Sequence, residues 1–194
     1  VLIQTFLPSA TGVTVVVRDT GKRYPMELAD EAGFYAVLVP GRKIPDYYFE
    51  TTEVNGSSRS FDDAYRFETP VTKETTAASA AGICYDVYRV LGAHPMKIDG
   101  KDGVHFAVWA PDAMRVSVVG DFDHWDGRCL PMRRLWDSGI FDLFVPGIEN
   151  GSIYKFEIKA KGGLTYLKAD PYAFSSEVRP NTASVVESLD GFHW

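Results

Sequence analysis

The residues best placed to do chemistry lie in one polar turn, which follows an apolar strand-like stretch ending near residue 120. The turn carries three aspartates, Asp121, Asp123 and Asp126, beside Trp125. A calcium loop needs oxygen ligands at positions 1, 3 and 5 and a glutamate at position 12, but Trp125 and Met132 occupy the fifth and twelfth places. A glycosidase needs two carboxyl groups about 5 to 10 Å apart across a cleft, one with its pKa raised by burial. An exposed turn provides neither arrangement, so we predict no metal site and no catalytic pair.

Trp125 instead predicts the binding of a sugar. A sugar ring offers a face of C–H groups and a rim of hydroxyls, so a binder needs an aromatic plane beside side chains that form hydrogen bonds. Trp125 supplies the plane. Lys155 alternates with Tyr154 and Phe156, so it points away from these apolar neighbours and can donate to hydroxyls. The alternative is structural, with Trp125 closing one end of a sandwich, and the residues alone leave both possibilities open.

No other motif predicts an active site. The four histidines show neither H-x-x-x-H nor H-E-x-x-H spacing, and His105 sits in an alternating strand as a satisfied or solvent-facing histidine. The sequence has no Gly-rich phosphate loop and no G-x-S-x-G motif. Cys84 and Cys129 lack metal-ligand spacing and indicate reduced thiols in a cytoplasmic protein. We therefore expect no catalytic residue, no metal and no cofactor.

Composition favours an all-β protein with a neutral partner. The 194 residues are 45% hydrophobic and 13% aromatic, with 17 glycines and 11 prolines, which is typical of short strands separated by turns. The net charge of −6 is spread without a run of like charges, which argues against a nucleic-acid or membrane partner. The sequence also lacks a transmembrane stretch, a signal peptide and an initiator Met, so we expect a fragment or a processed product.

Strand-like runs fill both halves of the chain. In the first half they are Gly12–Arg18, Arg23–Leu28, Gly33–Pro40 and Pro45–Glu53. In the second half they are Val104–Trp109, Met114–Gly120, Gly139–Val145, Ile153–Ala160 and Leu164–Leu167. A last edge strand that begins with a proline is expected over Arg179–Val186.

The two halves carry the same landmarks in the same order. Pro8, Ala10, Val13 and Val15 recur 103 residues later as Pro111, Ala113, Val116 and Val118. Gly33 and Pro40 recur after 106 residues, and Tyr47, Phe49, Glu50 and Asp63 recur after 107. Short loop insertions would produce this increase in the separation between matching residues. We therefore predict two tandem immunoglobulin-like antiparallel β-sandwiches of about 70 to 80 residues each, joined by a short helical linker.

The linker is expected over residues 71–93. Its Thr-, Ser- and Ala-rich start lacks aromatic residues, and a helix is predicted from about Thr76. Ile83, Val87, Val90 and Leu91 would form the apolar face of this helix, buried between the two sandwiches, and Gly92 would follow its end. Residues Lys97–Gly103 are expected to form a loop.

Motifs along the second half resemble one family. They are Leu91-Gly-Ala-His-Pro95, Trp109-Ala-Pro111, Arg115-Val-Ser-Val-Val-Gly120, Phe122, Trp125-Asp-Gly-Arg128, Pro131-Met132, Tyr154-Lys-Phe-Glu157 and Asp170-Pro-Tyr-Ala-Phe174. By these motifs residues 88–186 resemble the N-terminal module of bacterial glycogen branching enzymes, the 1,4-α-glucan branching enzymes of the α-amylase superfamily. The first half, including Asp62-Asp63-Ala-Tyr-Arg-Phe67, looks like the extra leading module of their longer form.

The resemblance implies an accessory role rather than catalysis. In the family the two modules precede a (β/α)8 barrel that carries the catalytic carboxylates, and no catalytic residue matches here. It implies modules at 1–70 and 94–186, and the start of a linker to the barrel at 187–194. The second module is similar to the family-48 carbohydrate-binding modules.

By that similarity Trp125 matches a ring that stacks on glucose and Lys155 matches a lysine that bonds hydroxyls. Tyr166 and Leu167 lie nearest to the expected second stacking ring, just before Asp170, and Tyr166 is the predicted site residue. The implied partners are α-1,4-glucan and the catalytic barrel of the same polypeptide. In an alternative, both modules are structural spacers that set chain-length preference without touching sugar.

Overall fold

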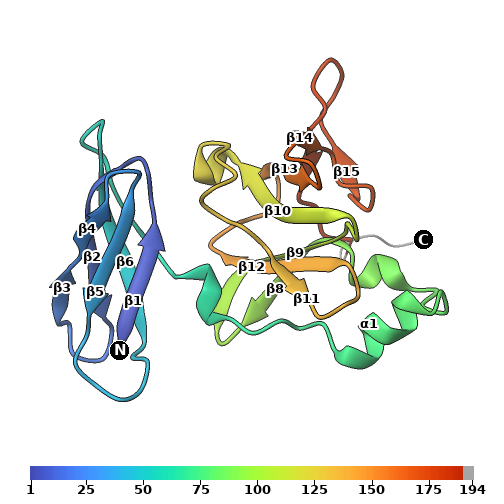
Figure 1. Cartoon of the computed structure of the whole chain (residues 1–194). Coiled ribbons are helices and arrows are strands. Elements are labelled where there is room, and N and C mark those ends of the chain that lie inside the picture. Colours follow the sequence, from blue (N-terminus) through green and yellow to red (C-terminus); the bar gives the residue numbers. More distant parts are fainter. Residues whose placement is uncertain (190–194) are drawn as a thin grey trace. The chain divides into compact units, whose positions relative to one another are not determined.

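The computed structural model describes residues 1–189 and divides into two compact units, Val1–Asp63 and the chain from Ala64 onward (Figure 1). Every strand pairing is antiparallel. Within residues 1–189, no helix has the length and apolar character needed to cross a membrane. The last part of the linker expected at 187–194 lies outside the described residues.

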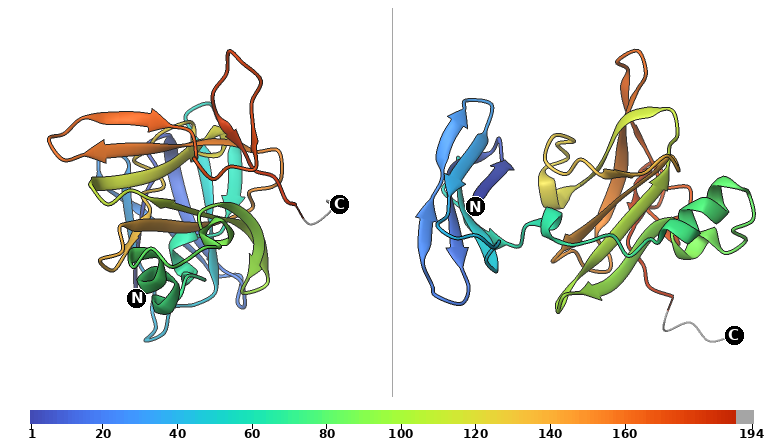
Figure 2. Two further views of the ribbon diagram at one scale, coloured as in Figure 1. Left: turned by 90° about the vertical axis from the view of Figure 1, so that its right-hand side faces the viewer. Right: turned by 60° about the horizontal axis from the view of Figure 1, so that its bottom comes forward.

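The first unit is a sandwich of two sheets (Figure 2). One sheet has the order β1 (Leu2–Phe6), β5 (Phe34–Leu38), β4 (Glu27–Asp30). The other has the order β3 (Arg23–Pro25), β2 (Ala10–Val17), β6 (Tyr47–Glu53), β7 (Ser58–Phe61). Inward-pointing side chains of both sheets form its core, among them Ile3, Val13, Val15, Tyr35 and Phe49. Period-two alternation along β2 and β6 places Val13, Val15 and Phe49 on the face that meets the other sheet.

The second unit repeats the arrangement of two antiparallel sheets. One sheet has the order β11 (Arg133–Leu135), β12 (Ile140–Pro146), β9 (Lys101–Trp109), β8 (Gly92–Ile98). The other has the order β10 (Ala113–Gly120), β13 (Ile153–Ala160), β16 (Ser184–Val185), β15 (Ser175–Ser176), and β14 (Thr165–Lys168) also pairs with β13. Phe106, Val116, Leu143, Tyr154 and Phe156 lie in its core. The predicted tandem of immunoglobulin-like sandwiches is confirmed.

Matching hydrogen bonds confirm the repeat at the level of single contacts. The Tyr47 hydroxyl donates to Asp63 Oδ2 at 2.6 Å, and the Tyr154 hydroxyl donates to Asp170 Oδ2 at the same distance. Further bonds recur in both units: Leu7 N to Gly33 O and Ala110 N to Gly139 O, both 2.8 Å, and Met26 N to Val13 O and Met132 N to Val116 O, 2.9 and 2.8 Å. The backbone therefore follows the same course in both units.

The predicted position of the linker helix is wrong. Helix α1 spans Lys73–Ala80, and it begins where the Thr72 hydroxyl accepts a hydrogen bond from Thr75 N at 3.2 Å. It ends before Gly82, whose φ of +71° breaks the helical path. Ile83 is consequently exposed rather than part of an apolar helix face.

The apolar spacing after the helix has another cause. After the helix the chain forms a short 3₁₀ turn, η2 (Val87–Arg89), which is followed by Val90 and Leu91. Val87, Val90 and Leu91 pack with Ala107 and Ile140 of the second unit. The spacing therefore reflects an irregular cover over the β9–β12 sheet rather than a helix. Residues 64–91 thus belong to the second unit.

Two further expectations are wrong. Lys97–Gly103 is not a loop, because β8 and β9 form a hairpin that turns at Asp99 and Gly100, with φ of 47° and 77°. The last strand is only Ser184–Val185, and it lies between β13 and β15 rather than at an edge.

The sheet that contains β9 is buried on both faces. On its outer face the Phe67 and Phe144 ring centroids lie 5.0 Å apart, and Arg133 Nη1 donates to Phe67 O at 2.7 Å. Beneath this cover His105 Nε2 lies 3.0 Å from Asp142 Oδ2, and both side chains are almost fully buried. His105 is therefore a satisfied strand histidine, one of the two roles expected for it.

Candidate functional site

Trp125 is displayed by a strained turn. Strand β10 ends at Gly120, the 3₁₀ turn η3 (Asp121–Asp123) follows, and His124 and Trp125 then both adopt left-handed conformations, with φ of 59° and 60°. Two successive non-glycine residues in this region persist only where their surroundings fix them. Asp123 does so, because its Oδ1 accepts hydrogen bonds from Gly120 N at 2.9 Å and from Trp125 N at 3.1 Å.

Asp123 is an unusual carboxylate. It is 4% exposed, and burial raises its pKa to about 6, although the two backbone N–H groups oppose this rise. Its second oxygen, Oδ2, has no hydrogen-bond partner among residues 1–189. Asp123 therefore supports the turn while the turn disfavours its charged form.

The indole of Trp125 is held at its edge. Its Nε1 donates to Asp121 Oδ1 at 2.8 Å, and the ring is half-buried. A ring fixed in this way loses little freedom when a flat ligand covers it. The turn thus provides a preorganised aromatic plane at the surface.

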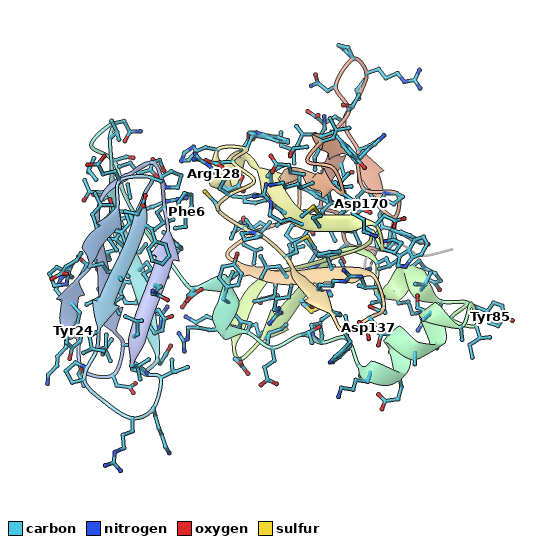
Figure 3. The ribbon with its side chains drawn as sticks, viewed as in Figure 1. Phe6, Tyr24, Tyr85, Arg128, Asp137 and Asp170 are labelled. Atoms are coloured by element: carbon cyan, nitrogen blue, oxygen red, sulfur yellow. The ribbon has the colours of Figure 1, made fainter. Side chains whose placement is uncertain are left out.

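The other two aspartate side chains of the turn have partners of their own. Asp121 accepts the indole N–H, and Asp126 pairs with Arg128, whose Nη2 lies 2.7 Å from Asp126 Oδ2 (Figure 3). The hydrogen bond from Arg128 lowers the pKa of Asp126. No group of three potential metal ligands occurs within the described part of the chain.

Lys155 lies at the same end of the β10–β13 pair as Trp125. Gly120, which accepts a hydrogen bond from Trp125 N, pairs with Tyr154, and Val119 pairs with Lys155. The Lys155 side chain is on the outer face of the sheet, and its Nζ donates to Thr182 Oγ1 at 2.8 Å. The structure therefore brings Trp125 and Lys155 to one end of the sheet, with Thr182 as a neighbour that sequence reasoning missed.

The strand register separates Tyr166 from these residues. Tyr166 pairs with Ile158, which packs against the core, so Tyr166 points to the opposite side from Lys155. Its ring lies 5.7 Å from the ammonium group of Lys168. Leu167 pairs with Glu157 and therefore shares the outer face with Lys155, where it is 46% exposed. Only the strand register shows which of Tyr166 and Leu167 lies on the outer face, and the register cannot be inferred from the sequence.

The chain after Trp125 covers part of the same outer face. Ser117 Oγ donates to Gly127 O at 2.6 Å, and Pro131 forms a bridge with Ser117. A Cβ on Gly127 would meet the carboxylate at the flexible end of the Glu157 side chain, so the chain passes close to that group. Glu157 in turn forms an ion pair with Arg115. The chain after Trp125 therefore covers part of the outer face of the β10–β13 pair and leaves uncovered the end that holds Trp125 and Lys155.

Comparison with known proteins gives matches over both units. Residues 1–65 match the family model of the alpha-1,4-glucan branching enzyme GlgB, N-terminal domain. Residues 90–173 match that of carbohydrate-binding module 48, the isoamylase N-terminal domain. Among solved structures, pullulanase from Anoxybacillus sp. LM18-11, complexed with maltotetraose, aligns with a TM-score of 0.43 and 20% identity over 97% of this chain and 25% of the pullulanase.

Curated relatives match along the full sequence. The chain is 42% identical to the 1,4-alpha-glucan branching enzyme GlgB of Synechococcus sp. (strain JA-3-3Ab), with 100% of this chain and 26% of the relative covered. It is 41% identical to the enzyme of the same name from Thermosynechococcus vestitus, with 99% and 25% covered. The chain thus spans about a quarter of the length of these relatives. It belongs to the GlgB family, as a GlgB N-terminal domain followed by a family-48 carbohydrate-binding module.

Proposed function

We propose that this chain is an accessory region of a 1,4-α-glucan branching enzyme of glycogen biosynthesis, and that its second unit contacts α-1,4-glucan through Trp125 and Lys155. The observation that supports this most directly is the preorganised Trp125 ring at the sheet end that holds Lys155. The ring offers the C–H face of glucose an apolar plane, and the ammonium group can exchange its bond to Thr182 for bonds to sugar hydroxyls.

The contact is expected to be weak. Covering one indole ring removes about 150 Å² of apolar surface from water, which is worth at most about 4 kcal/mol, and ordering a flexible glucan reduces this gain. Even the full 4 kcal/mol would correspond to a dissociation constant of only about 1 mM, so the expected binding is millimolar or weaker. Such a site becomes useful when other glucan sites on the same polypeptide raise the local concentration of the chain.

The other proposed partner is the catalytic barrel of the same polypeptide, on which the module at 94–186 would pack. The proposal draws support from the much greater length of the GlgB relatives. We also propose a cytoplasmic location, in agreement with a sequence that has only two cysteines and no disulfide framework.

Titration of the 194-residue chain with maltoheptaose, followed by ¹⁵N NMR, tests the glucan contact. The indole N–H signal of Trp125 should shift and saturate in the millimolar range, and the signals of Trp109 and Trp136 serve as internal controls. Trp125→Ala should abolish the saturable shifts at amides next to Lys155. Unchanged Trp125 and Lys155 signals at tens of millimolar sugar would exclude the contact.

One observation favours the spacer alternative. The polar atoms of both site residues already have partners, Trp125 Nε1 in Asp121 and Lys155 Nζ in Thr182. If the modules act only as spacers, these internal hydrogen bonds satisfy the polar atoms of both side chains, and no ligand is required. In the full-length enzyme, Trp125→Ala should leave chain transfer unchanged if the modules are spacers, and should selectively lower activity on long glucans if Trp125 contacts sugar.

A further inference from the structure

The first unit has an open hollow of about 390 Å³ on the outer face of its β3-β2-β6-β7 sheet. Binding sites for small ligands typically have volumes of about 300 to 1,000 Å³, so the hollow is large enough for part of an oligosaccharide. Gly12 leaves its floor open, because a Cβ added there would meet no atom within 4 Å. All lining residues belong to the first unit.

Strand register explains why the hollow is polar. One row of paired residues crosses four strands, and the next row on the same face crosses three. The rows are Pro25–Thr14–Glu50–Ser60 and Gly12–Thr52–Ser58. At about 4.8 Å between strands, the longer row spans roughly 14 Å. None of the four hydroxyls in these rows, on Thr14, Thr52, Ser58 and Ser60, has a side-chain hydrogen bond to any described residue. These hydroxyls are therefore available to a ligand.

The charged groups of the hollow are already neutralised. Arg23 forms a two-pronged ion pair with Glu50, in which Nη1 lies 3.2 Å from Oε1 and Nη2 binds Oε2. Arg59 Nε lies 3.1 Å from Glu53 Oε1. Paired charges leave no net charge for an ionic ligand, but their remaining N–H groups and lone pairs can serve a neutral polyhydroxyl ligand.

The internal repeat shows why the equivalent face of the second unit is covered. The counterpart of Thr14 is Ser117, which is fully buried under the chain that follows Trp125 and donates to Gly127 O. The distance between copies grows from 103 residues at Val118 to 106 at Pro131, so this connection is three residues longer in the second unit. In the first unit a tight turn, closed by a 2.8 Å bond from Gly21 N to Val17 O, leaves the face uncovered.

We propose that this hollow is a second α-glucan subsite, one that binds by hydrogen bonds rather than by stacking. The choice of glucan as ligand rests on the proposed function of the second unit. The chemistry of the hollow itself selects a neutral polyhydroxyl chain. Neither Tyr24 nor Tyr48 of this sheet offers an open aromatic plane: Tyr24 packs against the core, and the Tyr48 ring lies beneath the Arg18 guanidinium, 4.7 Å away. The binding should therefore be weak and should depend on linkage geometry, since the hydroxyls stand at fixed strand spacings.

¹⁵N NMR of the 194-residue Trp125→Ala variant isolates the hollow from the second unit. Titration with maltoheptaose should produce saturable shifts at the amides of Gly12, Thr14, Thr52 and Ser60 in the millimolar range. β-1,4-linked cellopentaose should shift them at least fivefold less. Gly12→Val, made in the same background, places its Cβ where no atom lies within 4 Å, fills the floor of the hollow and should remove the response. Thr20→Val, at an exposed turn of the same unit, is the matched control and should retain it.

The results separate the two proposals. Shifts in the first unit that survive Trp125→Ala and vanish with Gly12→Val support the subsite. Silent first-unit amides, while the wild-type second unit responds, overturn the subsite and leave the proposed function standing. Equal responses to both oligosaccharides, or a response that Gly12→Val leaves intact, also overturn it. First-unit shifts without any second-unit response would instead remove the Trp125 contact.

Discussion

Replacing Asp123 by Asn should stabilise the second unit at neutral pH. Burial raises the pKa of Asp123 to about 6, whereas the ordinary pKa of an aspartate, which applies in the unfolded chain, is 3.8. A group with a raised folded pKa contributes stability that is fully present below about pH 3.8 and is lost as the pH rises through about 6. Asn keeps the oxygen that accepts from Gly120 N and Trp125 N, and its amide replaces the unpartnered Oδ2.

The magnitude follows from the two pKa values. Each pKa unit corresponds to 1.36 kcal/mol, so the difference between 3.8 and about 6 amounts to about 3 kcal/mol at pH 7.5. The amide introduced by Asp123→Asn should match the protonated carboxyl group, so variant and wild type should be equally stable near pH 3.5. The stability gap should open between pH 4 and pH 6.5 and stay constant above that range.

Urea unfolding monitored by tryptophan fluorescence measures this effect in the right unit, because residues 1–63 contain no tryptophan. Asp126→Asn is the matched control. Hydrogen bonding from Arg128 lowers the pKa of Asp126, so its ionised form stabilises the fold and the substitution should destabilise the unit at neutral pH. The reasoning fails if Asp123→Asn lowers stability at pH 7.5, or if its effect is independent of pH.

Two further substitutions test close contacts in the second unit, each by urea unfolding followed by circular dichroism. Gly127→Ala should cost up to about 1 kcal/mol because the new Cβ displaces the flexible carboxylate end of Glu157 from its ion pair with Arg115, whereas Gly12→Ala should be nearly neutral; equal effects would contradict this account. Tyr154→Phe removes the hydroxyl that donates to buried Asp170 and should cost about 1 to 3 kcal/mol; an unchanged unfolding midpoint would show that this bond adds nothing.

The sequence predicted those features of the fold that follow from the local alternation of apolar residues and from the internal repeat. The strand at Ile153–Ala160 has the predicted bounds, because apolar and polar residues alternate from Tyr154 to its end. The repeat was visible because Tyr47 and Asp63 recur, as Tyr154 and Asp170, at a constant separation, and both pairs form the same hydrogen bond. Such features require no knowledge of distant contacts.

Features set by distant contacts could not be predicted. The spacing of Val87, Val90 and Leu91 fits a helix, but it arises from packing on the β9–β12 sheet. Tyr166 and Leu167 are equally plausible site residues until the pairing of β14 with β13 assigns each to a face. The Asp99-Gly100 pair did signal a hairpin, and the mistake was to interpret it as part of a loop.

Trp125 illustrates both what the sequence predicts and what it cannot predict. Its display in a polar turn follows from the flanking aspartates and glycines, whereas the supporting role of Asp123 depends on burial that the sequence does not reveal. For the same aspartates, the sequence analysis considered a calcium loop and a glycosidase pair and rejected both. In the structure Asp121 and Asp123 hold Trp125 instead.

The three-residue difference between the two connections has a consequence for engineering. In both units the connection ends at the same anchor, the bond from Met26 or Met132 to the preceding strand at Val13 or Val116. A segment that starts and ends on equivalent anchors can be transplanted. Moving the longer connection into the first unit would close its hollow and install a second indole, so one β-framework can carry either an open polar surface or a displayed ring, according to the length of a single loop.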